Sequence, residues 1–249
     1  MILRLVVLAL LALGAPARAE TPSECQVAAH LAETSFALPQ VARAIGEKTL
    51  NILVLGAGSS QLPGPEGVKN AYPARLQQAL SEKLSEVEVK VTTDVKARRT
   101  AAEMAKALPA DLERIKPSLL IWQTGTTDAM LGVDPDVFSQ ALDTGIGIAH
   151  TAGADVILVN AQYSPRTESM IALGTYAEDM RWVALQHEVP LFDRFSIMKL
   201  WSDLGTFDLY SATKKLDIAE HVHDCIGRLL ADLMVTAAKQ EEAPANGGR

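Results

Sequence analysis

The stretch from Asn51 to Gly67, NILVLGAGSSQLPGPEG, joins an apolar run to glycines and two serines. Small residues after a strand can cradle a phosphate, as in the dinucleotide fingerprint G-x-G-x-x-G, or expose a serine nucleophile. The fingerprint fails because Gln61 stands at the third glycine position and prolines follow where a helix should begin. The G-x-S-x-G nucleophile elbow also fails, since no pair of glycines brackets Ser59 or Ser60 at its spacing. The stretch therefore predicts no nicotinamide cofactor.

Short apolar runs recur along the chain at intervals too long for hairpins, and segments of helical periodicity separate them. We expect strands at 51–55, 87–92, 118–122, 155–160 and 189–192, and helices at 74–84, 100–114, 136–151, 168–187 and about 213–238. Strands that alternate with helices predict a three-layer, doubly wound parallel α/β sheet of about five strands. In such sheets ligands gather at the carboxyl ends of the strands, where GAGSS lies.

A basic cluster and two tryptophans also stand out in the sequence. Lys96, Arg98 and Arg99 form a basic cluster, which is either a dock for an anionic group or a solvated turn. Trp122 and Trp182 are expected in the core.

The first residues have the composition of a secretory leader. A basic residue precedes the apolar run 5–13, and helix breakers and the small-x-small triplet 17–19 follow. The run is shorter than the roughly 20 residues that a transmembrane helix needs. We expect a signal peptide at 1–19, cut after Ala19, and a periplasmic or secreted mature chain.

The mature chain is expected to be acidic. Loss of Arg4 and Arg18 changes the net charge from 23 − 30 = −7 to 21 − 30 = −9, which disfavours nucleic acid as a partner. No later apolar run predicts stable membrane insertion. We expect one domain at 20–239, with a disordered tail at 240–249.

Two cysteines, Cys25 and Cys225, stand near the two ends of the expected domain. In an oxidising compartment such a pair predicts a disulfide, and two buried free thiols are the alternative. Their wide separation lacks the paired spacing of zinc motifs, so no metal site is expected.

Several segments, taken in order, resemble motif blocks of the SGNH (GDSL-like) hydrolases, in particular secreted bacterial members. The GAGSS turn with AYPARLQQALSEKL resembles the first block, KARRTAAEM the second, IWQTGTTDAM the third and LDIAEHVHDCIGRLLA the last. The likeness covers nearly the whole mature chain. It implies a flavodoxin-like fold without a cofactor, in which a serine, a histidine and an aspartate hydrolyse an ester. The implied substrate is a small acyl ester or an acetylated glycan.

The resemblance also assigns the nucleophile and the oxyanion donors. The family order strand-Gly-Asp-Ser, laid on Leu55 and Gly56, puts Gly58 at the nucleophile position, and a shift of one or two residues supplies Ser59 or Ser60. In the third block a threonine replaces the asparagine of Gly-x-Asn-Asp. The implied oxyanion and substrate-binding residues are Ser59, Val95, Gly125, Thr127 and Asp128.

The last block departs furthest from the family pattern Asp-x-x-His. Asp217 is followed by Glu220 at that spacing, with His221 four residues on and His223 six residues on. On a helix Asp217 and His221 share a face, so the implied partners of the serine are Asp217 and His221, with His223 in reserve. The alternative is that both histidines are surface residues and the chain is a catalytically degenerate binding module on the SGNH fold.

Overall fold

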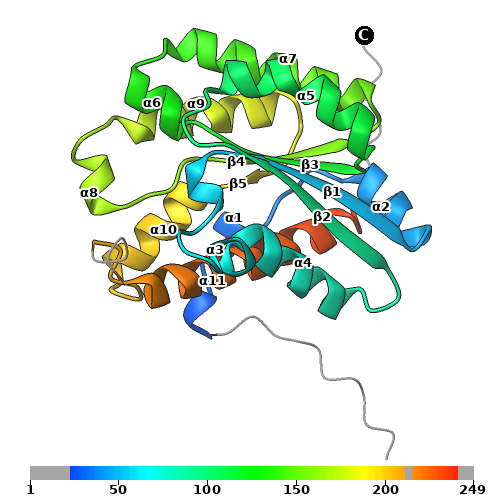
Figure 1. Cartoon of the computed structure of the whole chain (residues 1–249), viewed down its shortest axis with the longest axis horizontal. Helices are drawn as coiled ribbons and strands as arrows, with labels where there is room; N and C mark the ends of the chain where they lie inside the picture. The colour runs from blue at the N-terminus through cyan, green and yellow to red at the C-terminus, as the bar shows by residue number, and fades with distance from the viewer. Residues whose placement is uncertain (1–22, 211–214, 241–249) are drawn as a thin grey trace, which may run out of the picture.

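The structure, a computed structural model, describes residues 23–210 and 215–240. Five parallel strands form one sheet in the order β2-β1-β3-β4-β5 (Figure 1). The strands are β1 (Thr49–Gly56), β2 (Glu88–Val95), β3 (Leu119–Gln123), β4 (Asp155–Val159) and β5 (Leu191–Phe192). The predicted doubly wound α/β fold is confirmed.

Helices cover both faces of the sheet, as Figure 1 shows. One face carries α2 (Pro39–Gly46), α4 (Tyr72–Lys83), α10 (Arg194–Asp203) and α11 (Leu216–Ala237). The other carries α5 (Ala101–Ile115), α7 (Pro135–Thr151) and α9 (Leu173–Gln186). The short elements are η1 (Ser23–Cys25), α1 (Ala29–Ala32), η2 (Gly58–Ser60), α3 (Gly67–Asn70), α6 (Thr126–Leu131) and α8 (Pro165–Glu168).

Two hydrophobic cores explain why the central strands are apolar throughout. Along β1, Ile52 and Val54 face the core that contains α4 and α11, whereas Leu53 and Leu55 face the core that contains α5 and α7. Successive side chains of a strand point to opposite faces, so a sheet covered on both faces needs apolar residues at every position. The edge strand β2 has only partly buried and exposed positions, because it has a single neighbouring strand.

Two expectations about the α9 region are wrong. The helix expected at 168–187 is divided, because Ser164 caps the separate one-turn helix α8 and α9 begins only at Leu173. Trp182, expected in the core, is 58% exposed, whereas Trp122 is fully buried. The 3.6-residue period of α9 directs Tyr176, Met180 and Val183 to the core, so Trp182 faces outward.

The two ends of the described chain lie outside the regular sheet. The expected signal peptide at 1–19 falls outside the described residues, as does 241–249 of the expected tail. Gln240 is described, and its side-chain amide donates a hydrogen bond to the Thr34 carbonyl at 2.6 Å. Within the described ranges, no helix has the length and apolarity that crossing a bilayer would require.

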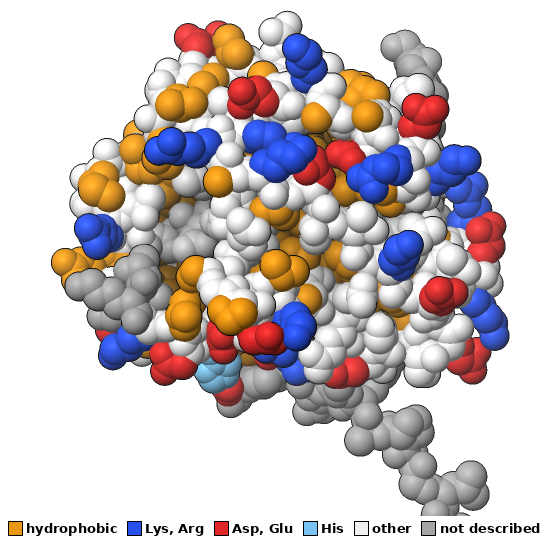
Figure 2. Space-filling view, viewed as in Figure 1, with side chains coloured by type: hydrophobic (Ala, Val, Ile, Leu, Met, Phe, Trp, Pro, Cys, Tyr) orange, Lys and Arg blue, Asp and Glu red, His pale blue; other side chains and the backbone are white. Residues whose placement is uncertain are grey.

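The surface carries charges of both signs. Figure 2 shows Lys and Arg side chains interspersed with Asp and Glu on one face, with hydrophobic side chains scattered among them. Arg99, from the predicted basic cluster, donates to Asp94 at 2.6 Å and is neutralised there. Lys96 also contacts Asp94, at 3.3 Å, so two of the three predicted basic residues share one carboxylate, and Arg98 is exposed.

Close contact between α11 and α4 brings the last helix to the sheet's carboxyl edge. A Cβ on Gly227 would lie 2.7 Å from the Arg75 Cβ and 2.8 Å from the Leu76 backbone nitrogen, so only glycine permits this approach. One turn earlier on α11, His223 consequently lies beside the first residue of α4, Tyr72. The two elements meet next to the carboxyl ends of β1 and β3, which are the switch point of a 2-1-3-4-5 sheet.

Candidate functional site

The turn after β1 folds Ser60 back beneath the end of the strand. The Ser60 backbone nitrogen donates to the Ala57 carbonyl at 2.9 Å, which closes the short turn η2. A Cβ on Gly56 would lie 2.3 Å from the Ser60 Oγ, so glycine at this position makes room for the buried hydroxyl. The turn therefore presents two different serines, Ser60 fully inside and Ser59 partly exposed.

Gln123, the last residue of β3, receives the polar groups of this turn. Its fully buried Oε1 accepts hydrogen bonds from the Ser60 Oγ at 2.6 Å, the Ser59 Oγ at 3.2 Å and the Ala57 nitrogen at 3.4 Å. Because Ser60 uses its only hydroxyl hydrogen on Gln123, the contact of 3.2 Å between Ser60 and Tyr72 has the Tyr72 hydroxyl as donor. Both serines thus donate to an amide oxygen, which is a poor proton acceptor for catalysis.

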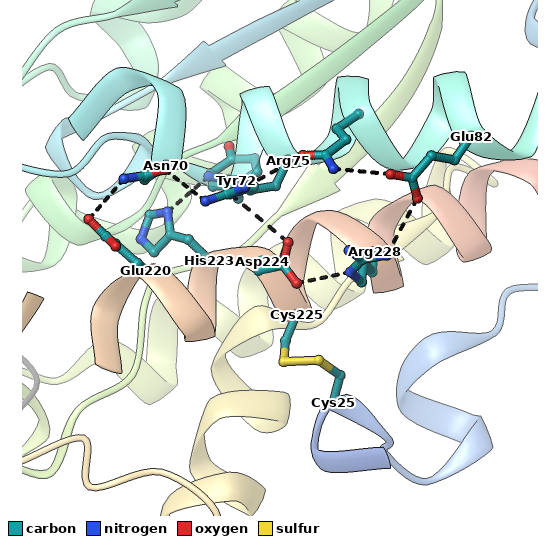
Figure 3. A network of polar contacts seen from close by, with 11 residues as sticks. Cys25, Asn70, Tyr72, Arg75, Glu82, Glu220, His223, Asp224, Cys225 and Arg228 are labelled. Atoms are coloured by element: carbon teal, nitrogen blue, oxygen red, sulfur yellow. Dashed lines mark hydrogen bonds and ion pairs between the residues drawn. A yellow bond between two sulfur atoms is a disulfide. The ribbon is translucent and has the colours of Figure 1, made fainter. Parts of the chain in front are cut away.

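His223 lies beside this cluster on the second turn of α11 and is 4% exposed. Its Nδ1 accepts a hydrogen bond of 2.9 Å from the backbone nitrogen of Tyr72 (Figure 3). Burial lowers the pKa of His223 well below its usual value, and the positive charge of Arg194 lowers it further. The ring is therefore neutral at pH 7, and its proton is on Nε2, because Nδ1 is occupied as an acceptor.

Arg194 is fully buried at the start of α10, next to the same cluster. Its guanidinium donates to the Ser59 carbonyl at 3.1 Å and to the Gln162 Oε1 at 2.9 Å. It also lies 5.5 Å from the centre of the Tyr72 ring, a cation–π distance. Burial lowers the pKa of Arg194 to about 10, while Tyr72 acts to raise it, so the group stays charged at neutral pH.

A cavity of ≈ 290 Å³ opens between the β1 turn and α11. Its polar lining includes Ser59, Gln162, Ser164 and His223, and most of its remaining wall is apolar. The full lining is Gly58, Ser59, Gln61, Leu62, Pro63, Gln162, Tyr163, Ser164, Met198, Leu209, Leu216, Ala219, Val222 and His223. The cavity thus joins one predicted serine to one predicted histidine.

The structure does not bring the other predicted partners of the serine to this cavity. Asp217 is exposed in the first turn of α11. The exposed His221 has its Nε2 3.2 Å from a Glu24 carboxylate oxygen, and its ring packs edge-on against Phe207. Neither Asp217 nor His221 is among the residues that line the cavity. The helical period that places Asp217 and His221 near one face turns His223 inward instead.

The predicted oxyanion residues other than Ser59 lie behind or beside the cavity. The Asp128 carboxylate is fully buried and accepts from the Ala101 nitrogen at 3.0 Å, at the first turn of α5. Burial raises the pKa of Asp128, and the Ala101 hydrogen bond opposes that rise. Gly125 takes a positive φ of 98° to begin α6, in which Thr127 is buried. Val95 lines a second, neighbouring cavity of ≈ 220 Å³ that also contains Ser60.

Some residues of the site had no role predicted from the sequence. Glu220 is one, and with the predicted reserve histidine, His223, it has the carboxylate-x-x-His spacing of the family's last block, three residues after Asp217 and Glu220. Glu220, however, accepts a hydrogen bond of 2.9 Å from the Asn70 side chain (Figure 3). Gln123 lies within the third block, but neither Gln123 nor Arg194 was assigned a role from the sequence, and only the assembled fold shows their place in the site.

The disulfide anchors the inner turn of α11. Cys25 and Cys225 are joined, with their Cα atoms 5.0 Å apart and a sequence separation of 200 residues (Figure 3). The bond lies two residues beyond His223, so it fixes the part of α11 that borders the cavity. The predicted disulfide is confirmed.

Solved structures of several esterases share this fold. The chain is similar to a lipolytic protein of the G-D-S-L family from Desulfitobacterium hafniense DCB-2, with 19% identity over 74% of this chain and 98% of that one and a TM-score of 0.58. It is similar to a two-domain esterase active on acetylated mannans, with 13% identity over 88% of this chain and 60% of that one and a TM-score of 0.71. It is also similar to a variant of Axe2, an acetyl-xylooligosaccharide esterase from Geobacillus Stearmophilus, with 14% identity over 77% and 95% and a TM-score of 0.57.

These identities are low, so the likeness shows the shared fold. No curated protein sequence matches the chain. The sequence profile of the Non-GDSL lipase-like family matches residues 24–240, which span nearly all of the described structure. Together with the G-D-S-L neighbour, this match confirms the resemblance to SGNH (GDSL-like) hydrolases, and the chain belongs to the Non-GDSL lipase-like family.

Proposed function

We propose that the chain is a periplasmic or secreted binding protein on the SGNH hydrolase fold, which holds a small acyl-bearing ligand without hydrolysing it. The observation that carries this proposal is the hydrogen bond from the Tyr72 backbone N–H to the His223 Nδ1. This hydrogen bond leaves the Nε2–H of the ring, and not a nitrogen lone pair, available to a group in the cavity. A catalytic histidine needs the opposite arrangement.

The chemistry of serine hydrolysis explains why this tautomer matters. A serine hydroxyl is a weak nucleophile until a neighbouring base accepts its proton. That base is held in the required tautomer by a carboxylate that accepts a hydrogen bond from Nδ1–H. Here a backbone donor occupies Nδ1, and Glu220 is engaged by Asn70. Ser59 and Ser60 both donate to Gln123, so the arrangement supports binding better than turnover.

The proposed ligand class follows from the cavity and from the likeness to known esterases. The largely apolar wall suits an acyl group, and the polar end suits a carbonyl or carboxyl oxygen. Two similar structures are of esterases described as acting on acetylated mannans and acetyl-xylooligosaccharides. Acyl esters and acetylated glycans are therefore the first ligands to test.

Export of the chain is part of the same proposal. The leader at 1–19, with its cut after Ala19, would direct the protein across the inner membrane. The Cys25–Cys225 disulfide supports this location, because disulfides persist in oxidising compartments.

Serine ester hydrolysis is the second candidate function, since Ser59 and His223 line the same cavity. In that case Ser59 would be the nucleophile and its own amide an oxyanion donor. His223 would first have to release the Tyr72 N–H and move its proton from Nε2 to Nδ1. Asp217, His221 and Ser60 would have to reach the cavity by rearrangement of α11 or of the turn.

A fluorophosphonate probe, which labels activated serines, separates the two functions. The binding proposal predicts no labelling of the folded wild-type chain and no release of acetate from acetylated xylo- or manno-oligosaccharides, which nonetheless bind. Labelling that Ser59→Ala or Ser60→Ala abolishes would instead establish a serine hydrolase.

A variant with a new serine at position 58 tests the role of His223 separately from the roles of Ser59 and Ser60. A Cβ on Gly58 meets nothing closer than the Ala97 Cβ at 3.6 Å, an ordinary contact, so Gly58→Ser is expected to fold. This variant puts a serine at the family's nucleophile position. We expect it to stay unlabelled, because no base is available. Strong labelling of Gly58→Ser would show that His223 does act as a base.

A further inference from the structure

The buried guanidinium of Arg194 lacks a carboxylate partner among the described residues. Its hydrogen bonds go to the Ser59 carbonyl and the Gln162 amide oxygen, both neutral groups. Its Nε is buried without a hydrogen-bond partner in the same part of the chain. A buried charge without a counter-ion costs free energy, so folded proteins seldom retain one unless something compensates it. An anionic ligand would supply that compensation.

Two of the polar side chains that line the cavity, Gln162 and His223, have hydrogen-bond donors left free. Because Arg194 holds the Gln162 Oε1, the free end of that side chain is its NH₂ group. Because Tyr72 holds the His223 Nδ1, the free ring nitrogen is Nε2–H. Gln162 and His223 both line the cavity, and the positive charge of Arg194 contacts the first and acts electrostatically on the second. Two donors supported by a buried cation form a site for an anion.

The rest of the wall indicates the chemical nature of that anion. Leu62, Pro63, Met198, Leu209, Leu216 and Val222 supply apolar lining. Inorganic phosphate or sulfate has no apolar part that could contact this apolar wall. The volume of ≈ 290 Å³ is just below the range of about 300–1,000 Å³ for small-molecule sites, which favours one short chain.

We propose that the cavity binds an aliphatic monocarboxylate, with the carboxylate at Gln162 and His223 above Arg194 and the hydrocarbon chain along the apolar wall. This inference rests on the proposed binding function and specifies its ligand as the free acid. An ester of the same chain has no negative charge and should bind less well.

Octanoate and methyl octanoate are matched probes of the proposal. Both are titrated into the isotope-labelled wild-type protein at pH 7.5 and followed in ¹H–¹⁵N correlation spectra, with the methyl signal of the ester showing whether it stays intact. We expect octanoate to shift the Gln162 side-chain and His223 ring signals, and to bind at least about tenfold more tightly than methyl octanoate.

Three arginine variants test the electrostatic argument. Arg194→Gln should weaken octanoate binding by about tenfold or more and leave methyl octanoate binding nearly unchanged. Arg194→Lys keeps the charge and should restore much of the affinity, which keeps the test informative if the glutamine variant folds poorly. Arg181→Gln is the matched control, because it changes the net charge equally but removes an arginine that contacts Asp193.

The outcomes separate failure of this inference from failure of the proposed function. The monocarboxylate site would be overturned if intact methyl octanoate and octanoate bound equally well, or if octanoate did not bind. Either result would still allow the chain to bind other acyl ligands. An equal loss of octanoate affinity in Arg194→Gln and Arg181→Gln would also overturn the monocarboxylate site, because the attraction would then depend only on the net charge of the protein. Hydrolysis of methyl octanoate that Ser59→Ala abolishes would overturn the proposed function itself.

Discussion

Two polar clusters at the carboxyl edge of the sheet differ in how completely their groups are paired. At the ends of β4 and β5, Asp193 accepts hydrogen bonds from Asn160 at 2.7 Å and from the Ser196 nitrogen at 3.0 Å, and it also contacts Arg181. The Asn160 Oδ1 in turn accepts from the Phe195 nitrogen at 2.8 Å. This cluster, Asn160–Asp193–Ser196–Arg181, has a donor for every acceptor, which is typical of a structural network.

The cluster at the ends of β1 and β3 is paired less completely. Within the described chain, the Gln123 Nε2 and the Arg194 Nε are buried without partners. Asp193 and Arg194 are neighbours in sequence, yet Asp193 joins the paired cluster and Arg194 the other. Asp193 is already paired with Arg181, so Arg194 remains without a carboxylate partner among the described residues, as the proposed anion site requires.

The largest effect is expected in the paired cluster. Asp193→Ala removes an acceptor used by buried Asn160 and by the first turn of α10, and should destabilise the fold by about 3 kcal/mol. The melting temperature should fall by about 6–12 °C. Octanoate binding should persist below the new melting temperature. A shift of less than about 2 °C would show that this cluster is not structural.

His223→Ala should give the next largest loss, because it leaves the buried Tyr72 N–H without an acceptor. The expected cost is about 1–3 kcal/mol in urea unfolding. His223→Asn is the matched variant, since an asparagine oxygen can replace the Nδ1 acceptor, and it should recover at least half of the loss. Equal losses in the two variants would contradict the assigned hydrogen bond.

The two clusters should respond to acid in different pH ranges. Burial and Arg194 depress the folded-state pKa of His223, so the unfolded chain binds a proton there first, and stability falls as the pH drops below about 6.5. The slope from one such group is at most about 1.4 kcal/mol per pH unit. In urea unfolding between pH 7 and 5, wild type should lose stability relative to His223→Asn. Parallel curves would contradict a depressed pKa.

Asp193 should lose its contribution to stability in a lower pH range than His223. Burial acts to raise its pKa, but hydrogen bonds from Asn160, Ser196 and Arg181 outweigh that effect and hold the pKa below 3.8. Its contribution is therefore present above the unfolded pKa and is lost only as the pH falls through the lower folded value.

The smallest effects distinguish the two serines of the β1 turn. Ser60→Ala removes a buried hydroxyl that bridges Gln123 and Tyr72, and should cost about 1 kcal/mol. Ser59→Ala removes a longer, partly exposed hydrogen bond and should change stability by less than about 0.5 kcal/mol. The reverse order in chemical unfolding would contradict the description of the turn.

The fold was predictable because the signals that specify it are local. Continuous apolar runs at Ile52–Leu55 and Leu119–Trp122 predict strands covered on both faces, and the helical period predicts most of the covering helices. Trp182 was wrongly expected in the core because its aromatic character was given more weight than the helical period, which directs Tyr176, Met180 and Val183 inward. Helix α10 was not predicted either, although Asp193 supplies the N-cap that begins it.

The site was predictable only in part. The family blocks predicted that Ser59 and the α11 histidines meet at the carboxyl edge, and the structure places Ser59 and His223 on one cavity. The choice between His221 and His223 depends on the rotation of α11 about its axis, which is set by long-range packing at Gly227 and Cys225. Gln123 and Arg194 bond partners between 32 and 135 residues away in sequence, so no local pattern identifies their roles.

The most direct test of the binding account is the tautomer of His223. A long-range ¹H–¹⁵N correlation spectrum of histidine-labelled protein at pH 7 reports which ring nitrogen carries the proton, and His223→Asn assigns the signal by its disappearance. We expect a neutral ring with the proton on Nε2 and Nδ1 unprotonated. A proton on Nδ1 with Nε2 unprotonated would contradict the binding function, because His223 would then be a base in the cavity that Ser59 also lines.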